Sequence, residues 1–289
     1  MRPDRPSRTA LRVAQSRAAH QLLDTPRVLD DPLAVRIVGG EGVLELRGGM
    51  GGLAARLTRG LRAFVVARSR LAEDELAAAI ARGVRQYVIL GAGLDTFAYR
   101  SPLAHAGLRI FEVDHPATQA WKRSRLAAAG VGAPPSLSFV PVDFETQSFA
   151  AELYGAGLRA DAPAFLSWLG VTMYLTSEAV IGTLRWVAEG LARGSGIVFD
   201  YATPPESVNL PQRFIYRALL RRVAAAGEPF RSFFVPAQLS AALAALGFTH
   251  IEDLGAPELN ARYFARRADG LRVGGLARLV CARTGLSAP

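Results

Sequence analysis

Two glycines and a later acid have the spacing of an adenosine-binding turn. A strand-like apolar run ends in Gly91-Ala92-Gly93, and a second such run ends in Glu112 and Asp114, with 21 residues from Gly93 to Asp114. Glycines let the backbone turn sharply and approach a ligand, and an acid about 20 residues later can accept hydrogen bonds from ribose hydroxyls. The pattern predicts an adenosine-type cofactor at the carboxyl ends of a parallel sheet.

The identity of that cofactor depends on the residues that follow the turn. A dinucleotide site usually has a third glycine where this chain has Thr96, and Asp95 would place a negative charge near a pyrophosphate. S-adenosylmethionine has no phosphates, and the ammonium of its amino-acid end tolerates a nearby acid. The sequence therefore favours S-adenosylmethionine over NAD, with a ligand-free glycine turn as a third interpretation.

Other polar side chains could complete such a site. We expect Asp114 to bind the ribose, with Glu112 on the same face of its strand able to assist. Asp143 could accept a hydrogen bond from the adenine amino group, with Phe144 packed beside the ring. Arg68 could pair with the cofactor carboxylate, because a guanidinium binds a carboxylate through two parallel hydrogen bonds.

The acceptor side of the site is less sharply marked. Tyr174, Tyr201, Arg262 and Tyr263 are candidate substrate contacts, and Arg17 is a second candidate partner for the cofactor carboxylate. A catalytic base is needed only if the acceptor starts protonated, and no residue is identified as one; a carboxylate is already ionised at pH 7. No group of Cys, His, Asp and Glu has the spacing of metal ligands, so no metal site is expected.

Apolar runs alternate with helical patterns from Gln86 onward. Helical spacing is clear in Ser177–Leu191 and in the segment that Pro236 opens. Such alternation implies an α/β fold with a largely parallel sheet and helices on both faces. Seven strands are expected: one from Gln86 to Leu90, then Arg109–Asp114, Leu137–Asp143, Ala164–Val171, Gly196–Tyr201, Phe248–Leu254 and Leu276–Arg283.

Two segments stand outside this alternation, and we expect them to cover the site. The N-terminal helices, within residues 1–75, would form a cap on a sheet core of residues 76–289. Residues 203–235 would form a lid-like insertion after the fifth strand. Gly39–Gly52 is rich in glycine, which predicts a mobile loop. The whole chain, 1–289, is expected to be a single domain.

The composition of the chain limits which kinds of binding partner are expected. The chain has 289 residues, 50% of them hydrophobic, and a formal net charge of +9. The arginines are scattered, which disfavours a nucleic-acid partner; a small molecule or peptide bearing a carboxylate fits the charge equally well. Cys281 is the only cysteine, and neither a signal peptide nor a membrane-spanning run is evident, so a cytoplasmic location is expected. The oligomeric state stays open.

Several motifs in the same order resemble the leucine carboxyl methyltransferase-like family, and in particular its bacterial branch of candidate S-adenosylmethionine-dependent methyltransferases. They are GAGLDTFAYR, FEVDHP, Lys122 and GVTMYLT, with RAAHQLLDTPRVLDDPLA, ARSRLAED and ELNARYFARRADGL elsewhere. The resemblance covers most of the chain. It implies a class I methyltransferase-like (Rossmann-like) fold with an antiparallel last strand, and it supports Arg68, Asp114 and the Asp143-Phe144 pair as cofactor ligands.

One residue departs from the family pattern. The resembled proteins usually carry an acid before Gly-Val-Thr, where this chain has Leu169. That acid resembles a partner for the cofactor ammonium, so its loss implies weaker binding unless another acid, such as Asp95, compensates. The prediction is an S-adenosylmethionine-dependent O-methyltransferase of secondary metabolism, acting on a small-molecule or peptide carboxylate or hydroxyl. The alternatives are a catalytically weakened cofactor-binding homologue and a nicotinamide-dependent oxidoreductase.

Overall fold

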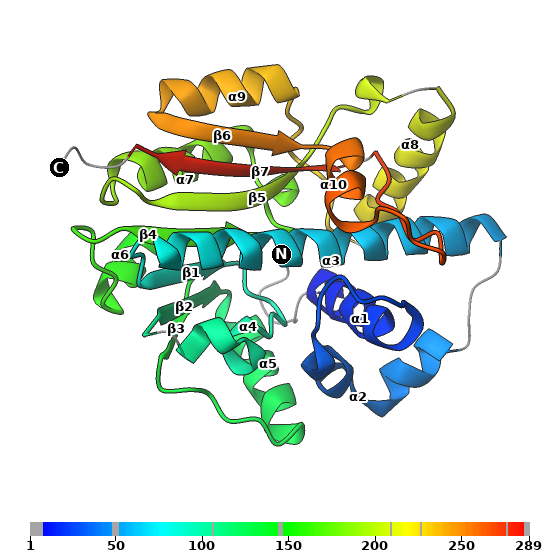
Figure 1. Ribbon diagram of the computed structural model, residues 1–289, viewed down its shortest axis with the longest axis horizontal. Helices are drawn as coiled ribbons and strands as arrows, with labels where there is room; N and C mark the ends of the chain where they lie inside the picture. Colours follow the sequence, from blue (N-terminus) through cyan, green and yellow to red (C-terminus); the bar gives the residue numbers. More distant parts are fainter. Residues whose placement is uncertain are drawn as a thin grey trace.

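A seven-stranded sheet forms the centre of the protein (Figure 1). The computed structural model describes residues 8–47, 52–105, 107–143, 147–208, 210–225, 227–275 and 277–285. The strands are β1 (Gln86–Leu90), β2 (Arg109–Asp114), β3 (Leu137–Pro141), β4 (Ala164–Trp168), β5 (Gly196–Ala202), β6 (Phe248–Leu254) and β7 (Ala277–Thr284). Their order is β3-β2-β1-β4-β5-β7-β6, and β7 runs antiparallel to both β5 and β6. The expected seven-stranded, mostly parallel sheet with an antiparallel last strand is confirmed.

Helices cover both faces of the sheet, and β1 shows why, because alternate residues of a strand point to opposite faces. Tyr87 and Ile89 pack in a core cluster with α3 (Gly52–Ala81), whereas Val88 and Leu90 pack with α7 (Ser177–Glu189) and α9 (Pro236–Ala245). Burial on both sides is typical of parallel strands. The other α-helices are α1 (Arg8–Leu23), α2 (Pro32–Arg47), α4 (Phe97–Arg100), α5 (Pro116–Ala128), α6 (Phe149–Gly155), α8 (Leu210–Ala225) and α10 (Ala256–Tyr263).

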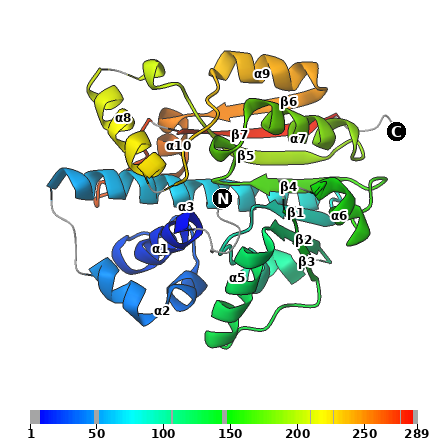
Figure 2. The same cartoon turned by 180° about the vertical axis from the view of Figure 1, so that it is seen from behind.

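The N-terminal helices and α8 lie at the end of the sheet where the parallel strands finish, as the two opposite views show (Figure 1, Figure 2). Ala18 of α1 and Leu33 and Ile37 of α2 form a buried cluster with Leu94, which follows the glycine turn. The N-terminal helices are therefore packed directly onto the end of β1.

The prediction of a mobile loop at Gly39–Gly52 is wrong for the first part of that segment. The helix α2 continues to Arg47, with a kink at Gly39, where φ is 81° and ψ is 170°. Glycine adopts a positive φ without strain, so the helix bends there and resumes. Residues 48–51 lie outside the described part of the chain.

The third and fourth strands end earlier than expected, at Pro141 and Trp168. Beyond β4 the chain turns at Gly170, whose φ is 74°. It then forms a short 3-10 helix, η2 (Thr172–Tyr174). This turn brings the residues after β4 beside the glycine turn after β1.

Candidate active site

The turn after β1 requires glycine at both of its glycine positions. Gly91 and Gly93 have φ values of 68° and 48°, in the left-handed region that other residues rarely adopt. A Cβ on Gly91 would lie 2.4 Å from the Cγ2 of Val171, and one on Gly93 would lie 3.1 Å from the Cβ of Ala10. The turn is therefore held closely between the segment after β4 and the helix α1.

The amides of this turn are used within the protein. Five N–H groups between residues 91 and 97 already have acceptors: Gly91 and Ala92 donate to the Val113 carbonyl at 2.8 and 3.0 Å, Gly93 to Asp114 at 2.5 Å, Asp95 to the Ala92 carbonyl at 2.7 Å, and Phe97 to Asp95 at 2.8 Å. A pyrophosphate is bound by free amides at the start of a helix. The following helix, α4, has only four residues. This arrangement suits a cofactor without phosphates and disfavours NAD.

Asp114 ends β2 beside the turn, as the spacing predicts. Its Oδ2 accepts the Gly93 amide, its Oδ1 accepts the His115 amide at 2.7 Å, and the side chain is nearly buried. Burial raises the pKa of this carboxyl, and the two amide bonds oppose that shift. Each carboxylate oxygen has a second lone pair, so Asp114 can still accept hydrogen bonds from ribose hydroxyls.

Glu112 does not share that position, although it lies on the same face of β2. It is fully buried and pairs with Lys122 of α5, with 2.6 Å between the Oε2 and Nζ atoms. The expectation that Glu112 assists Asp114 is therefore wrong, because the cation that the sequence places on the next helix holds it inside the core.

An apolar cavity of about 280 Å³ opens at the carboxyl ends of β1 and β4. The cavity has room for an aromatic ring. Asp143, just after β3, lies beside it, because the Oε1 of the lining residue Gln147 accepts the Asp143 amide at 2.9 Å. Phe144 lies outside the described residues. The lining residues are Leu90, Gln147, Phe149, Trp168, Val171, Leu175, Ala179, Gly182 and Thr183.

Arg68 reaches the same end of the sheet from α3. Its Nη1 lies 2.7 Å from the Oδ2 of Asp200 on β5, and both side chains are buried. The Oδ1 of Asp200 accepts the amide of Gly170 at 2.5 Å. Reasoning from the sequence missed Asp200, although a single acid within the apolar run GIVFDYA was an available signal.

Arg17 ties the N-terminal cap to the turn. Its guanidinium donates to the Leu94 carbonyl, and it lies 3.2 Å from a carboxylate oxygen of Asp31 and 3.5 Å from one of Asp95. The side chain is only 3% exposed. These contacts give Arg17 a structural role in seating α1, in place of the expected contact with the cofactor carboxylate.

A family comparison accords with this arrangement. The model described as leucine carboxyl methyltransferase matches residues 10–188. The chain belongs to the leucine carboxyl methyltransferase family. It is an S-adenosylmethionine-dependent methyltransferase.

Individual relatives of this methyltransferase extend the match. YktD, a candidate S-adenosyl-L-methionine-dependent methyltransferase of Bacillus subtilis (strain 168), is 32% identical over 292 residues, covering 94% of this chain and 95% of YktD. A similarly described protein of Parafrankia sp. (strain EAN1pec) is 37% identical, covering 68% of this chain and 63% of its own length. The crystal structure of a DUF574 family protein from Streptomyces avermitilis has the same fold, with a TM-score of 0.59, 19% identity and coverage of 96% and 98%.

Tyr174 of the methyltransferase is the predicted acceptor-side residue that lies nearest this arrangement. Its ring packs edge-on against Phe230, with 5.4 Å between centroids. Burial raises the pKa of its hydroxyl, which a hydrogen bond with Thr9 opposes. Thr9 of α1 also donates to Glu228, so residues of the cap and of the 203–235 segment meet beside Tyr174.

The other three predicted substrate contacts have structural partners instead. The Tyr201 hydroxyl donates to Asp253 at 2.6 Å, and its ring is fully buried on the opposite face of β5 from Asp200. Arg262 lies 3.4 Å from Glu252, and the Tyr263 hydroxyl donates to Asp74 at 2.9 Å. The structure therefore does not bring Tyr201, Arg262 and Tyr263 to the glycine turn.

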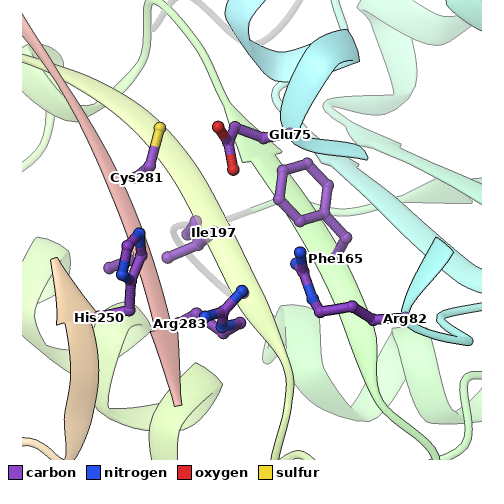
Figure 3. A pocket seen from close by; sticks show the side chains of 9 residues that line it. Glu75, Arg82, Phe165, Ile197, His250, Cys281 and Arg283 are labelled. Atoms are coloured by element: carbon purple, nitrogen blue, oxygen red, sulfur yellow. The ribbon is translucent and has the colours of Figure 1, made fainter. Parts of the chain in front are cut away.

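A second, small pocket lies on the α3 face of the sheet (Figure 3). Glu75 and Cys281 line this pocket. Together with Glu252 they place potential ligand atoms within 4.8 Å of one another, a proximity that sequence spacing did not reveal. Arg82 and Arg283 line the same pocket, whose volume is about 10 Å³. That volume is too small for an organic cofactor. Burial raises the pKa of the Cys281 thiol, which keeps it protonated as a core residue.

Within the described ranges, no helix combines the length and the apolar character needed to cross a membrane.

Proposed function

We propose that this methyltransferase transfers a methyl group to an oxygen of a small-molecule or peptide substrate, with a carboxylate as the preferred acceptor and a hydroxyl as the alternative. A small-molecule acceptor of this kind suits secondary metabolism. The observation that supports this proposal concerns Tyr174 and His115, two groups among the described residues that could act as a base beside the site. Burial keeps the Tyr174 hydroxyl protonated, and His115 caps α5 with its Nδ1. A carboxylate needs no base, since it is ionised at neutral pH.

The cofactor fits the residues that surround the turn. Asp114 would accept hydrogen bonds from the ribose, Arg68 would bind the carboxylate of the amino-acid end, and the apolar cavity beside Asp143 would hold the adenine. S-adenosylmethionine, when bound, supplies a methyl group on a positively charged sulfur. The role of the protein is then to hold donor and acceptor in line, because positioning supplies much of the rate of such a displacement.

We propose further that the chain works as a single unit in which residues 1–75 and 203–235 close over a core of residues 76–289. The contact between Thr9 and Glu228 supports this arrangement. The segment before α9 is also bonded to the sheet end, since Arg231 donates to the Met173 carbonyl at 2.7 Å and Phe234 to the Ala202 carbonyl at 3.0 Å. Closure of such segments excludes water during transfer.

Two alternative functions can be weighed against specific observations. A weakened homologue that binds the cofactor without turnover is suggested by Leu169, where the family usually has an acid. A nicotinamide-dependent oxidoreductase would need phosphate-binding amides, and the amides of Gly91, Ala92 and Gly93 are already bonded. The bonded amides therefore count against the second alternative, whereas the first rests on Leu169 alone.

The experiment has a binding stage and a transfer stage. Isothermal titration should detect S-adenosylhomocysteine binding and no NAD binding; the reverse result would refute the proposal. Transfer from S-adenosylmethionine carrying a labelled methyl group is then measured on panels of carboxylic acids and of alcohols and phenols. Methyl esters release labelled methanol in mild alkali, whereas methyl ethers do not. Alkali-labile label is expected, and alkali-stable label would identify a hydroxyl acceptor.

A further inference from the structure

A buried acid on β5 lies beside the position where the family acid is missing. We propose that Asp200 is a positioning residue that holds Arg68 and the Gly170 turn for the amino-acid end of S-adenosylmethionine, in place of an acid at position 169. This role rests on the proposed cofactor site.

Position 169 itself cannot supply the charge. Leu169 is an apolar residue that packs against the core cluster on the α3 face. Asp95, the compensating acid suggested by the sequence, is engaged elsewhere: its Oδ1 accepts the Phe97 amide at 2.8 Å and its Oδ2 faces Arg17 at 3.5 Å. The missing carboxylate must therefore come from another element.

The two carboxylate oxygens of Asp200 connect two different segments, α3 and the turn after β4. One oxygen lies 2.7 Å from the Nη1 of Arg68, and the other accepts the Gly170 amide at 2.5 Å. A Cβ on Gly170 would lie 2.8 Å from the Nη2 of Arg68, so the guanidinium rests directly on this turn. The hydroxyl of Thr172 donates to the Asp200 carbonyl. Helix α3, the turn after β4 and strand β5 are thereby fixed at one point.

Asp200 balances the buried positive charge of Arg68. Arg68 is 6% exposed and Asp200 is 0% exposed, and an unpaired buried charge is strongly unfavourable. Among the described residues, Asp200 is the acid with which Arg68 forms an ion pair. A guanidinium has further N–H donors beyond the one that faces Asp200. These donors can bind a carboxylate while Asp200 keeps the group in place.

The position of the cluster relates it to the amino-acid end of the cofactor. Val171, next to Gly170, contacts the turn at Gly91 closely enough that a Cβ there would overlap it. Tyr174, on the acceptor side, is near enough to both residues that Arg68 lowers and Asp200 raises the pKa of its hydroxyl. The Arg68–Asp200 pair thus lies close both to the segment that contacts the glycine turn and to Tyr174. A group bearing both a carboxylate and an ammonium would be complementary to this pair.

The test compares two ligands that differ only at the amino-acid end. S-adenosylhomocysteine has that end, and 5′-methylthioadenosine lacks it but keeps the adenosine and the sulfur. In Asp200→Asn, calorimetry should show S-adenosylhomocysteine affinity about 10- to 100-fold weaker, the range for a lost charged hydrogen bond. Affinity for 5′-methylthioadenosine should be unchanged, which also shows that the variant is folded.

Three further variants separate positioning from general damage. Arg68→Gln should weaken S-adenosylhomocysteine alone, and adding Asp200→Asn to it should cost little more, because the two residues act through one interaction. Leu169→Glu in the Asp200→Asn background should recover part of the affinity. Asp253→Asn is the matched control, since this acid pairs with Arg278 at 2.8 Å on the sheet edge; both affinities should stay normal.

The opposing outcomes are distinct. Unchanged S-adenosylhomocysteine affinity in Asp200→Asn would overturn this role, and so would an equal loss for both ligands. Fully additive losses in the double variant would show that Asp200 does not act through Arg68. If the wild-type protein bound neither ligand, the proposed function would fail and this role with it, whereas wild-type binding with normal binding by Asp200→Asn would refute this role alone.

Discussion

The carboxylate of Asp114 accepts the amide hydrogen of Gly93 with 2.5 Å between nitrogen and oxygen. The residue proposed to bind the ribose therefore also holds the turn that approaches it. The bond joins the end of β2 to the turn that follows its parallel neighbour β1. Ligand contact and loop geometry thus depend on one side chain.

Asp114→Ala should weaken S-adenosylhomocysteine binding by about one to two orders of magnitude. A lost hydrogen bond to a charged group is worth roughly 1.5–3 kcal/mol, and the Gly93 amide loses its acceptor as well. Calorimetry measures the effect, with Asp161→Asn as a control, since this acid pairs with Arg159 on the surface. Wild-type affinity in a folded Asp114→Ala variant would remove Asp114 from the site.

Gly91→Ala should lower the free energy of unfolding by more than about 2 kcal/mol. The new Cβ would meet the Cγ2 of Val171 at 2.4 Å, and a left-handed φ costs other residues roughly 1–2 kcal/mol. Urea denaturation measures the loss. Gly91→Ala with Val171→Ala should regain the steric part only, and Gly132→Ala, with open space around it, should be nearly neutral. Equal stability of the Gly91 and Gly132 variants would contradict the steric argument.

Residue periodicity and glycine spacing predicted the sheet and the position of Asp114, because both are local properties of the chain. The residues that meet only through the fold could not be predicted in this way. Asp200 and Arg68 are 132 positions apart, and their pairing follows from the β4–β5 neighbourhood and the course of α3. The predicted substrate contact of Tyr201 is wrong for a related reason: the sequence shows that neighbouring residues of β5 point to opposite faces, but only the fold shows that Asp200 has the face with Arg68.

Glu112→Gln should reduce the loss of stability between about pH 4.5 and pH 7. Burial raises the pKa of Glu112 from 4.5 to about 7, against the pull of Lys122. The native protein therefore keeps this proton at pH values where the unfolded chain has released it, so stability falls as pH rises through this window and levels off above it. A pKa difference of this size corresponds to about 3 kcal/mol at most.

Urea denaturation at a series of pH values from 4.5 to 8 checks this prediction. The quantity to compare is the slope of unfolding free energy with pH, because Glu112→Gln also leaves Lys122 beside a neutral group and shifts the absolute stability. Asp114 has a pKa raised in the same direction and remains in the variant, so a shallower slope is expected. An identical slope in both proteins would contradict a raised pKa for Glu112.

Hydrogen exchange should show that the cap and the lid-like segment respond to the cofactor. With S-adenosylhomocysteine bound, we expect added protection in α1, in residues 227–235 and in the turn at Gly91–Asp95, since Thr9 and Glu228 join the first two. Helix α9, which packs on the face opposite α3, should be unchanged. Protection confined to the glycine turn would show that the two segments do not close over the cofactor.

Gly91 and Ala92 donate their backbone amides to the Val113 carbonyl, so the preference for a cofactor without phosphates depends on main-chain hydrogen bonds. Side-chain substitution can remove the charge of Asp95, but it cannot free peptide groups that are already committed to a neighbouring strand. Conversion to a dinucleotide enzyme would require the junction between β1 and β2 to be rebuilt. Sequence drift at exposed positions would therefore change what this protein methylates long before it changed what donates the methyl group.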